Sequence, residues 1–351
     1  MWAYTLALLR LIWTSHYLHR KGKMRGTFRA LILILLDITI LSSPTMSYPS
    51  LPGEAQIIFT SDRGGDYDIY LLNAHGLRNL TRHPAFDSDP AWSPDGSKIA
   101  FVSDRSGGLD IYVMDADGKN VRQLTEDPAQ DRRPAWSPDG RRIAFTSYRD
   151  GNGEIYVVDV DGRNLRNLTN DPAADVEPSW SPDGSKIAFS SDRSGGLDIY
   201  VMDADGRNPR RLTKDPEVDG FPDWSPDGER IAFMSHRWRG PNIFLMDISG
   251  RIIRAITNSG WDWAPAWSPD GRWIVFSSSR ERFNTEIYIV DSEGGNLQKL
   301  TNNASVDEDP DWYDPTVRYG ISPEERCMIL WVWLKNPVAF PLSLNRWAST
   351  K

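Results

Sequence analysis

One pentapeptide, Trp-Ser-Pro-Asp-Gly, recurs along the chain at nearly constant spacing. It begins at Trp92, Trp136, Trp180, Trp224 and Trp267, at intervals of 44, 44, 44 and 43 residues, and a degraded sixth copy begins at Trp312. A period in the low forties is the length of one four-stranded propeller blade. The spacing therefore predicts an array of blades, which constrains the fold more than any other feature of the sequence.

Each period contains four short segments with strand character. In one copy they are Ala91-Trp92, residues 98–103 (KIAFVS), residues 110–114 (DIYVM) and residues 121–125 (VRQLT). The segments are rich in β-branched and aromatic residues, and the stretches between them contain the Pro, Gly and Asp residues typical of turns. The pattern predicts an all-β chain.

The phase of the repeats predicts how the array closes. The first copy begins at its second strand, near Gln56, and has no Trp-containing strand before it, whereas the strand around Trp312 has no partner strands after it. We therefore expect a six-bladed β-propeller over residues 54–314, with four antiparallel strands per blade and the C-terminal Trp strand completing blade one. A closed ring leaves no long unpaired strand edge.

The repeated motifs also resemble a known family. W-S-P-D-G-x-x-I-A-F-x-S-x-R, I-Y-x-M-D-x-D-G and the trailing L-T are similar to the WD40-like propeller repeat of the TolB family, over about residues 54–314. The resemblance implies a periplasmic six-bladed propeller that binds envelope proteins. It covers the propeller only, because the α/β domain that precedes it in TolB is not evident here. The propellers of prolyl-oligopeptidase-like peptidases resemble these repeats too.

The two ends of the chain differ from the repeats. Residues 30–41 (ALILILLDITIL) are mostly apolar, follow four basic residues and precede small and polar residues. This layout predicts that residues 1–47 are a secretory signal peptide, with an N-terminal membrane anchor as the alternative. We expect no stable membrane insertion after processing. Residues 315–351 form a C-terminal extension whose apolar run, residues 328–334, is too short to cross a membrane.

Charge and composition exclude several classes of protein. The chain has 40 basic and 48 acidic residues, a formal charge of −8, which argues against a nucleic-acid partner. The single cysteine, Cys327, excludes an internal disulfide and a thiolate metal cluster. The sequence shows no zinc, EF-hand or phosphate-loop motif and no nucleophile elbow. We therefore expect no cofactor, no metal and no catalytic residues.

Features shared by all six copies indicate structural roles, because one protein does not need six copies of a catalytic group. The tryptophans at 92, 136, 180, 224, 267 and 312 are predicted to pack between blades. The Asp of each D-x-x-P motif and the Arg of each F-x-S-x-R motif are predicted to form charge-assisted pairs.

The loops that follow the F-x-S-x-R and Leu-Thr motifs vary between copies, and they share one face of the ring. Recognition normally uses variable loops on a rigid scaffold. The first candidate cluster on this face comprises His236, Trp238, Arg239, Phe221, Trp261 and Trp263, which either bind a partner or plug the channel. The second comprises Arg132, Arg133 and Tyr148 and faces the acidic residues Asp89, Glu177, Glu308 and Asp309. It either receives an acidic peptide or carboxylate or pairs with these neighbouring charges.

Three functional hypotheses follow from these observations. The first is an exported, monomeric, non-catalytic scaffold that binds a protein or peptide, such as an envelope protein. The second is a propeller that senses carbohydrates or peptides through the Trp cluster. The third is a propeller hydrolase or lactonase with a metal in the channel.

Overall fold

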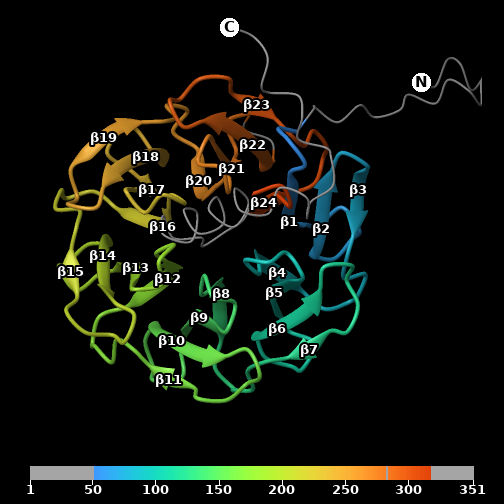
Figure 1. Cartoon of the computed structure of the whole chain (residues 1–351), viewed down its shortest axis with the longest axis horizontal. Helices are drawn as coiled ribbons and strands as arrows, with labels where there is room; N and C mark the ends of the chain where they lie inside the picture. The colour runs from blue at the N-terminus through green and yellow to red at the C-terminus, as the bar shows by residue number, and fades with distance from the viewer. Residues whose placement is uncertain (1–50, 282–283, 318–351) are drawn as a thin grey trace, which may run out of the picture. The chain divides into compact units, whose positions relative to one another are not determined.

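The computed structural model describes residues 51–281 and 284–317 of the 351-residue chain. These residues form 24 strands in six four-stranded antiparallel sheets arranged around a ring (Figure 1). The six-bladed all-β propeller predicted from the repeats is therefore confirmed. The predicted leader, residues 1–47, and the extension from residue 318 onward lie outside the described residues. Within the described part of the chain, no helix is long and apolar enough to span a bilayer.

Each blade follows the same order of strands. Blade 1 combines β24 (Asp307–Tyr313) with β1 (Gln56–Ser61), β2 (Asp68–Asn73) and β3 (Gly76–Asn79). Blade 2 consists of β4 (Asp87–Trp92), β5 (Lys98–Ser103), β6 (Asp110–Asp115) and β7 (Arg122–Gln123). Blade 3 consists of β8 (Asp131–Trp136), β9 (Arg142–Ser147), β10 (Glu154–Asp159) and β11 (Arg166–Asn167). Blade 4 consists of β12 (Asp175–Trp180), β13 (Lys186–Ser191), β14 (Asp198–Asp203) and β15 (Arg210–Arg211). Blade 5 consists of β16 (Asp219–Trp224), β17 (Arg230–Ser235), β18 (Asn242–Asp247) and β19 (Ile252–Ala255). Blade 6 consists of β20 (Asp262–Trp267), β21 (Trp273–Ser278), β22 (Glu286–Asp291) and β23 (Gln298–Lys299).

The C-terminal strand closes the ring. β24 pairs with β1 in antiparallel register, with Ile57 opposite Trp312 and Ile58 opposite Asp311. Arg63, which follows β1, also donates to the carboxylate of Asp307 at the start of β24. The prediction that the last Trp strand completes blade one is therefore confirmed.

The tryptophan of each repeat contributes to the core between two blades. Trp136 of blade 3 belongs to a buried cluster that also contains Val102 and Ile111 of blade 2 and Phe145 of blade 3. Equivalent clusters surround Trp92, Trp180, Trp224 and Trp267. Burial of these large aromatic surfaces joins neighbouring blades through the hydrophobic effect.

The repeated Asp–Arg pairs are present in all six blades, as predicted. In blade 2, Arg105 Nη2 lies 2.8 Å from Asp87 Oδ1, and Arg105 Nε donates to Ser103 Oγ. The other pairs are Arg63–Asp307, Arg149–Asp131, Arg193–Asp175, Arg237–Asp219 and Arg280–Asp262, at 2.5–3.0 Å. Because each aspartate begins the innermost strand of its blade, the pair fixes the loop after the second strand to the channel wall.

Two strand boundaries differ from those expected. The first strand of blade 2 extends from Asp87 to Trp92, because it continues across a β-bulge between Ser88 and Ala91. The fourth strand is shorter than expected, since only Arg122 and Gln123 pair with β6. As a result, the variable residues between Asp and Pro of each D-x-x-P motif lie on the innermost strands and not in loops.

Candidate central channel site

The innermost strands β4, β8, β12, β16, β20 and β24 surround a central channel (Figure 1). In each strand the bulge places the residue before the proline at a left-handed φ of 49–58°. The proline that follows has no N–H to donate, which suits a bulge and not a continuous ladder. The six residues at this position line the channel and are called the first ring: Asp89, Arg133, Glu177, Phe221, Ala264 and Asp309.

Arg133 crosses the channel at the level of the first ring. Its Nη1 lies 2.6 Å from Asp309 Oδ1 and 3.4 Å from Asp89 Oδ1. Its guanidinium group also lies 4.9 Å from the centre of the Phe221 ring. Arg133 of blade 3 thereby contacts side chains from blades 1, 2 and 5, and with Phe221 it obstructs the channel.

The electrostatics of the first ring centre on this guanidinium group. Burial alone would lower the pKa of Arg133, but the carboxylates of Asp309 and Asp89 raise it above its ordinary value. Burial raises the pKa of Glu177, although the charge of Arg133 opposes that shift. Glu177 Oε2 accepts hydrogen bonds from Ser190 Oγ at 2.7 Å and from the backbone N–H of Phe221 at 2.8 Å.

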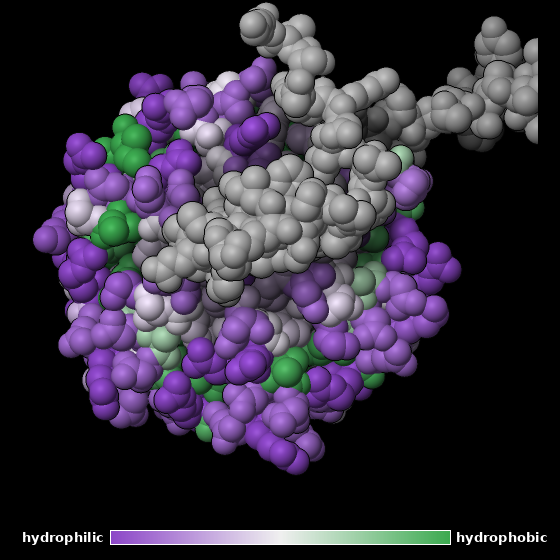
Figure 2. Space-filling model, in the orientation of Figure 1, coloured by the Kyte–Doolittle hydropathy of each residue, from purple (hydrophilic) through white to green (hydrophobic). Residues whose placement is uncertain are grey.

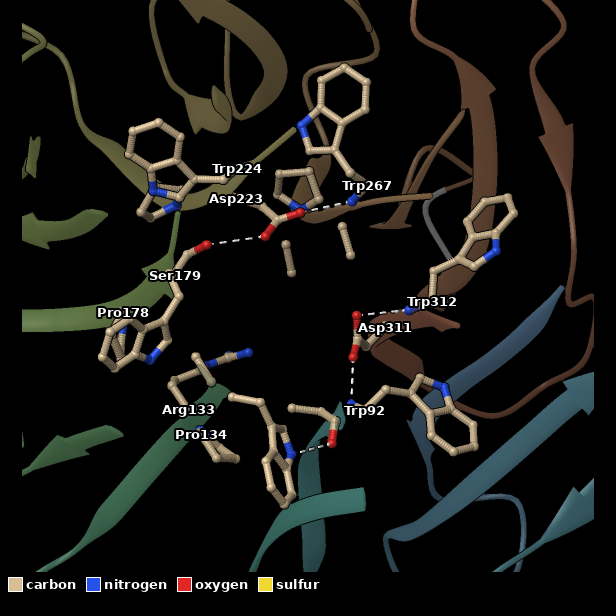
Figure 3. Close-up of a pocket in the computed structure, with 18 of the residues that line it drawn as sticks. Trp92, Arg133, Pro134, Pro178, Ser179, Asp223, Trp224, Trp267, Asp311 and Trp312 are labelled. Atoms are coloured by element: carbon tan, nitrogen blue, oxygen red, sulfur yellow. Dashed lines mark hydrogen bonds between the residues drawn. The ribbon is translucent and has the colours of Figure 1, made fainter. Parts of the chain in front are cut away.

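A second ring of residues lies next to the first ring, on the side of the Trp-Ser-Pro turns. It consists of the residues between Pro and Trp of each innermost strand: Ala91, Ala135, Ser179, Asp223, Ala266 and Asp311. The two aspartates carry charge into a ring that is otherwise made of alanine and serine. Figure 3 shows both carboxylates at the channel wall, with their hydrogen bonds as dashed lines.

Each second-ring aspartate accepts hydrogen bonds at the junction with the next blade. Asp223 accepts from the backbone N–H of Trp267 at 2.8 Å and from Ser179 Oγ at 3.2 Å, while Asp311 accepts from the backbone N–H of Trp92 at 2.6 Å. Burial raises the pKa of Asp223 to about 7 and the charge of Asp311 adds to the shift. Burial likewise raises the pKa of Asp311 to about 6.

The first predicted cluster is divided between the channel and two loops. Phe221 lies in the first ring, and Trp263 is half-buried on β20. His236, Trp238 and Arg239 lie on the loop between β17 and β18, and Trp261 lies on the loop before β20. These two loops are in contact, because a Cβ atom added at Gly240 would lie 2.5 Å from the carbonyl oxygen of Gly260.

The second predicted cluster is also divided. Arg133 enters the channel, while Arg132, next to it on β8, donates from Nε to Gln130 Oε1 at 3.0 Å. Tyr148 lies on the loop after β9 and is exposed. The facing acidic residues Asp89 and Asp309 do contact Arg133 directly.

Asp223 and Asp311 were not among the residues predicted from the sequence. Their signal is the position between Pro and Trp of the repeat, where four copies have Ala or Ser and two have Asp. Among the described residues, no group of three or more His, Cys, Asp or Glu side chains could hold a metal ion.

Comparisons with known proteins agree with the fold. A family model described as the TolB beta propeller domain matches residues 40–133, 126–218 and 196–317. The structure is similar to that of TolB from Acinetobacter baumannii, with 27% identity and a TM-score of 0.67 over 75% of this chain and 68% of that chain. No curated protein matches the chain.

Two further solved structures share the fold. A TolB-type protein from Agrobacterium tumefaciens is 24% identical, with a TM-score of 0.59 over 74% of this chain and 98% of that chain. A Mycobacterium tuberculosis puromycin-hydrolyzing peptidase is 20% identical, with a TM-score of 0.53 over 68% of this chain and 41% of that chain. At these identities the likeness concerns the fold alone.

Proposed function

Because this chain belongs to the TolB beta-propeller family, we propose that it is an exported scaffold that binds a protein or peptide without catalysing a reaction on it. The binding surface in this proposal is the pair of touching loops in blades 5 and 6 that carry Trp238 and Trp261. These side chains are 53% and 50% exposed. Exposed tryptophans of this kind commonly provide most of the binding energy at protein interfaces.

Blade 5 differs from the other blades at this surface. The residue after the repeated Arg is Gly, Ser, Asp or Glu in the other five copies and Trp238 here, and the tyrosine of the third strand is replaced by Phe244. Trp238 packs edge-on against Phe244, with ring centres 5.1 Å apart. Trp238 thus replaces a residue such as Ser106, whose hydroxyl group donates to Asp110 in blade 2.

A groove lies beside Trp238. Its volume is about 740 Å³, and its lining includes Phe244, Arg254, Leu297 and the Glu293 that pairs with Arg254. Part of this space arises because Ala255 occupies the position where other blades have Asn79, Gln123, Asn167, Arg211 or Lys299. The volume and the mixed apolar and charged lining suit a few side chains of a bound segment.

On the face shown in Figure 2, most of the coloured surface is hydrophilic, and hydrophobic residues gather in small separate patches. The single observation that carries the proposal is the presence of two half-exposed tryptophans on two touching loops, of which Trp238 lines a groove. Large exposed apolar patches on a protein surface commonly mark an interaction site.

The proposal is tested by purifying tagged protein from producing cells and identifying bound proteins by mass spectrometry. The double variant Trp238→Ala/Trp261→Ala should lose the partners that wild type captures, while keeping a nearly unchanged melting temperature. Ile248→Ala is the matched control, because Ile248 is also 50% exposed but lies at the opposite end of β18. Retention of the same partners by the double variant would place the binding surface elsewhere, and binding to a glycan array that depends on Trp238 would favour carbohydrate recognition instead.

A further inference from the structure

We infer that the channel contains a second binding site, at the end opposite the Trp238 loops, which takes a cationic group such as a guanidinium or primary ammonium group. The site is a cavity of about 280 Å³ between the first ring and the Trp-Ser-Pro turns. All six innermost strands contribute prolines and tryptophans to its wall (Figure 3). This site is independent of the partner-binding surface proposed above.

The first ring separates this cavity from the other mouth of the channel. Arg133 contacts Asp309, Asp89 and the ring of Phe221, and these contacts extend across the channel. A ligand that enters from the side of the Trp-Ser-Pro turns therefore reaches the second ring and stops below Arg133. The cavity volume accommodates one long side chain and excludes a folded segment.

The two second-ring carboxylates determine which ligand the cavity prefers. Asp223 and Asp311 belong to blades 5 and 1, on either side of Ala266 of blade 6, and the charge of Asp311 contributes to the raised pKa of Asp223. Among the described residues, neither carboxylate forms an ion pair with a lysine or arginine. A carboxylate has about four acceptor sites, so hydrogen bonds from Ser179 and Trp267 leave Asp223 able to accept more.

In the first ring, a pair of aspartates already binds a cationic group. Asp89 and Asp309, in blades 2 and 1, hold the guanidinium group of Arg133 between them. The second ring repeats the pair of aspartates without supplying the cation. Charge-assisted hydrogen bonds in a partly desolvated cavity are stronger than those between neutral groups, so a cationic side chain or amine is the ligand that complements these residues.

The inference is tested with N-acetylargininamide as the cationic probe and N-acetylcitrullinamide as its neutral counterpart of nearly equal shape. Calorimetry or ligand-detected NMR at pH 8 should show saturable binding of the arginine compound only. Asp223→Asn/Asp311→Asn should weaken that binding at least tenfold. Asp205→Asn is the matched control, since it removes a carboxylate from an exposed turn outside the channel, and it should change the affinity less than threefold.

A second variant locates the ligand inside the cavity. Ala266→Leu keeps both carboxylates and fills the space between them, so it should also abolish binding, with circular dichroism used to verify its fold. The inference is overturned if both compounds bind equally, if neither binds, or if either variant binds the arginine compound as wild type does. Binding of Ca²⁺ to these aspartates without binding of the arginine compound would overturn it as well.

Discussion

At the scale of the residue, two glycines of blade 4 have the same backbone conformation, but only one of them contacts a neighbouring blade. Gly206 and Gly195 have similar positive φ values, 92° and 95°. A Cβ atom at Gly206 would lie 2.4 Å from the carbonyl oxygen of Leu168 in blade 3, whereas a Cβ atom at Gly195 would meet nothing within 4 Å. The turn that contains Gly206 therefore rests directly on the backbone of the preceding blade.

This difference predicts unequal effects of alanine. Gly195→Ala should cost about 1–2 kcal/mol of the free energy of unfolding, because it adds only left-handed backbone strain. Gly206→Ala should cost about 1–3 kcal/mol more, because it also forces two blades apart. Urea denaturation of both variants measures the difference. Equal losses would mean that the turn moves away without disturbing the junction.

Asp223 predicts how stability depends on pH. Its pKa is about 7 in the folded protein and ordinarily 3.8, so between these values the folded state holds more protons than the unfolded state. Stability should therefore fall as pH rises from 5 to 8, and Asp311, with a pKa of about 6, acts in the same direction. Asp223→Asn should lose less stability than wild type over this range.

Melting temperatures at pH 5 and pH 8 test this prediction. Asp205→Asn, on an exposed turn, serves as the control and should keep the pH dependence of wild type. A variant Asp223→Asn with the full wild-type dependence would show that the carboxylate of Asp223 is ionised in the folded protein throughout this range.

At the scale of the element, closure of the ring depends on β24. Without this strand, the backbone of β1 would have an unpaired edge along its channel side, and Arg63 would lose the carboxylate of Asp307. A chain that ends at Val306 should therefore aggregate or unfold without a cooperative transition. A chain that ends at Val317 retains all six complete sheets and should remain a soluble propeller with a sharp thermal transition. Gel filtration and calorimetry distinguish the two, and similar behaviour of both chains would contradict the role given to β24.

The elements were predictable from the sequence because each is encoded six times. The length of the fourth strand is the exception, because β7, β11, β15 and β23 each span only two residues and the expected strand is too long in every one of these copies. The bulge at Asp89 was not predictable, because the alternation of buried and exposed residues does not reveal a single extra residue before a proline. The bulge places the first-ring residues in the channel wall. Without knowledge of the bulge, these residues were predicted to lie in loops.

At the scale of the whole molecule, the repeat produces a nearly symmetric wall and the exceptions to the repeat produce the sites. Arg133 contacts Asp309, 176 positions away in the chain, and no periodic pattern specifies which residues meet across a channel. Asp223 and Asp311 were overlooked for the same reason, since the significance of two aspartates depends on their sharing one cavity. Trp238 and Trp261 could be chosen as candidates from the sequence alone, because a large aromatic residue in a turn differs from the residues at most turn positions, but their role in binding stays a prediction.

The N-terminal region predicts that the protein is exported and that its leader is removed. Residues 30–41 form an apolar stretch after basic residues, and the first strand begins only at Gln56. Removal of a leader that ends between these segments would leave every blade intact, so a cell that exports the protein should contain a mature form whose N-terminus lies between residues 42 and 55. Because Met24 precedes the apolar stretch, a gene that starts at Met24 should yield the same mature form. N-terminal sequencing and mass measurement of the fractionated protein provide the test. Recovery of the uncleaved chain in the membrane fraction would instead identify residues 1–47 as an anchor.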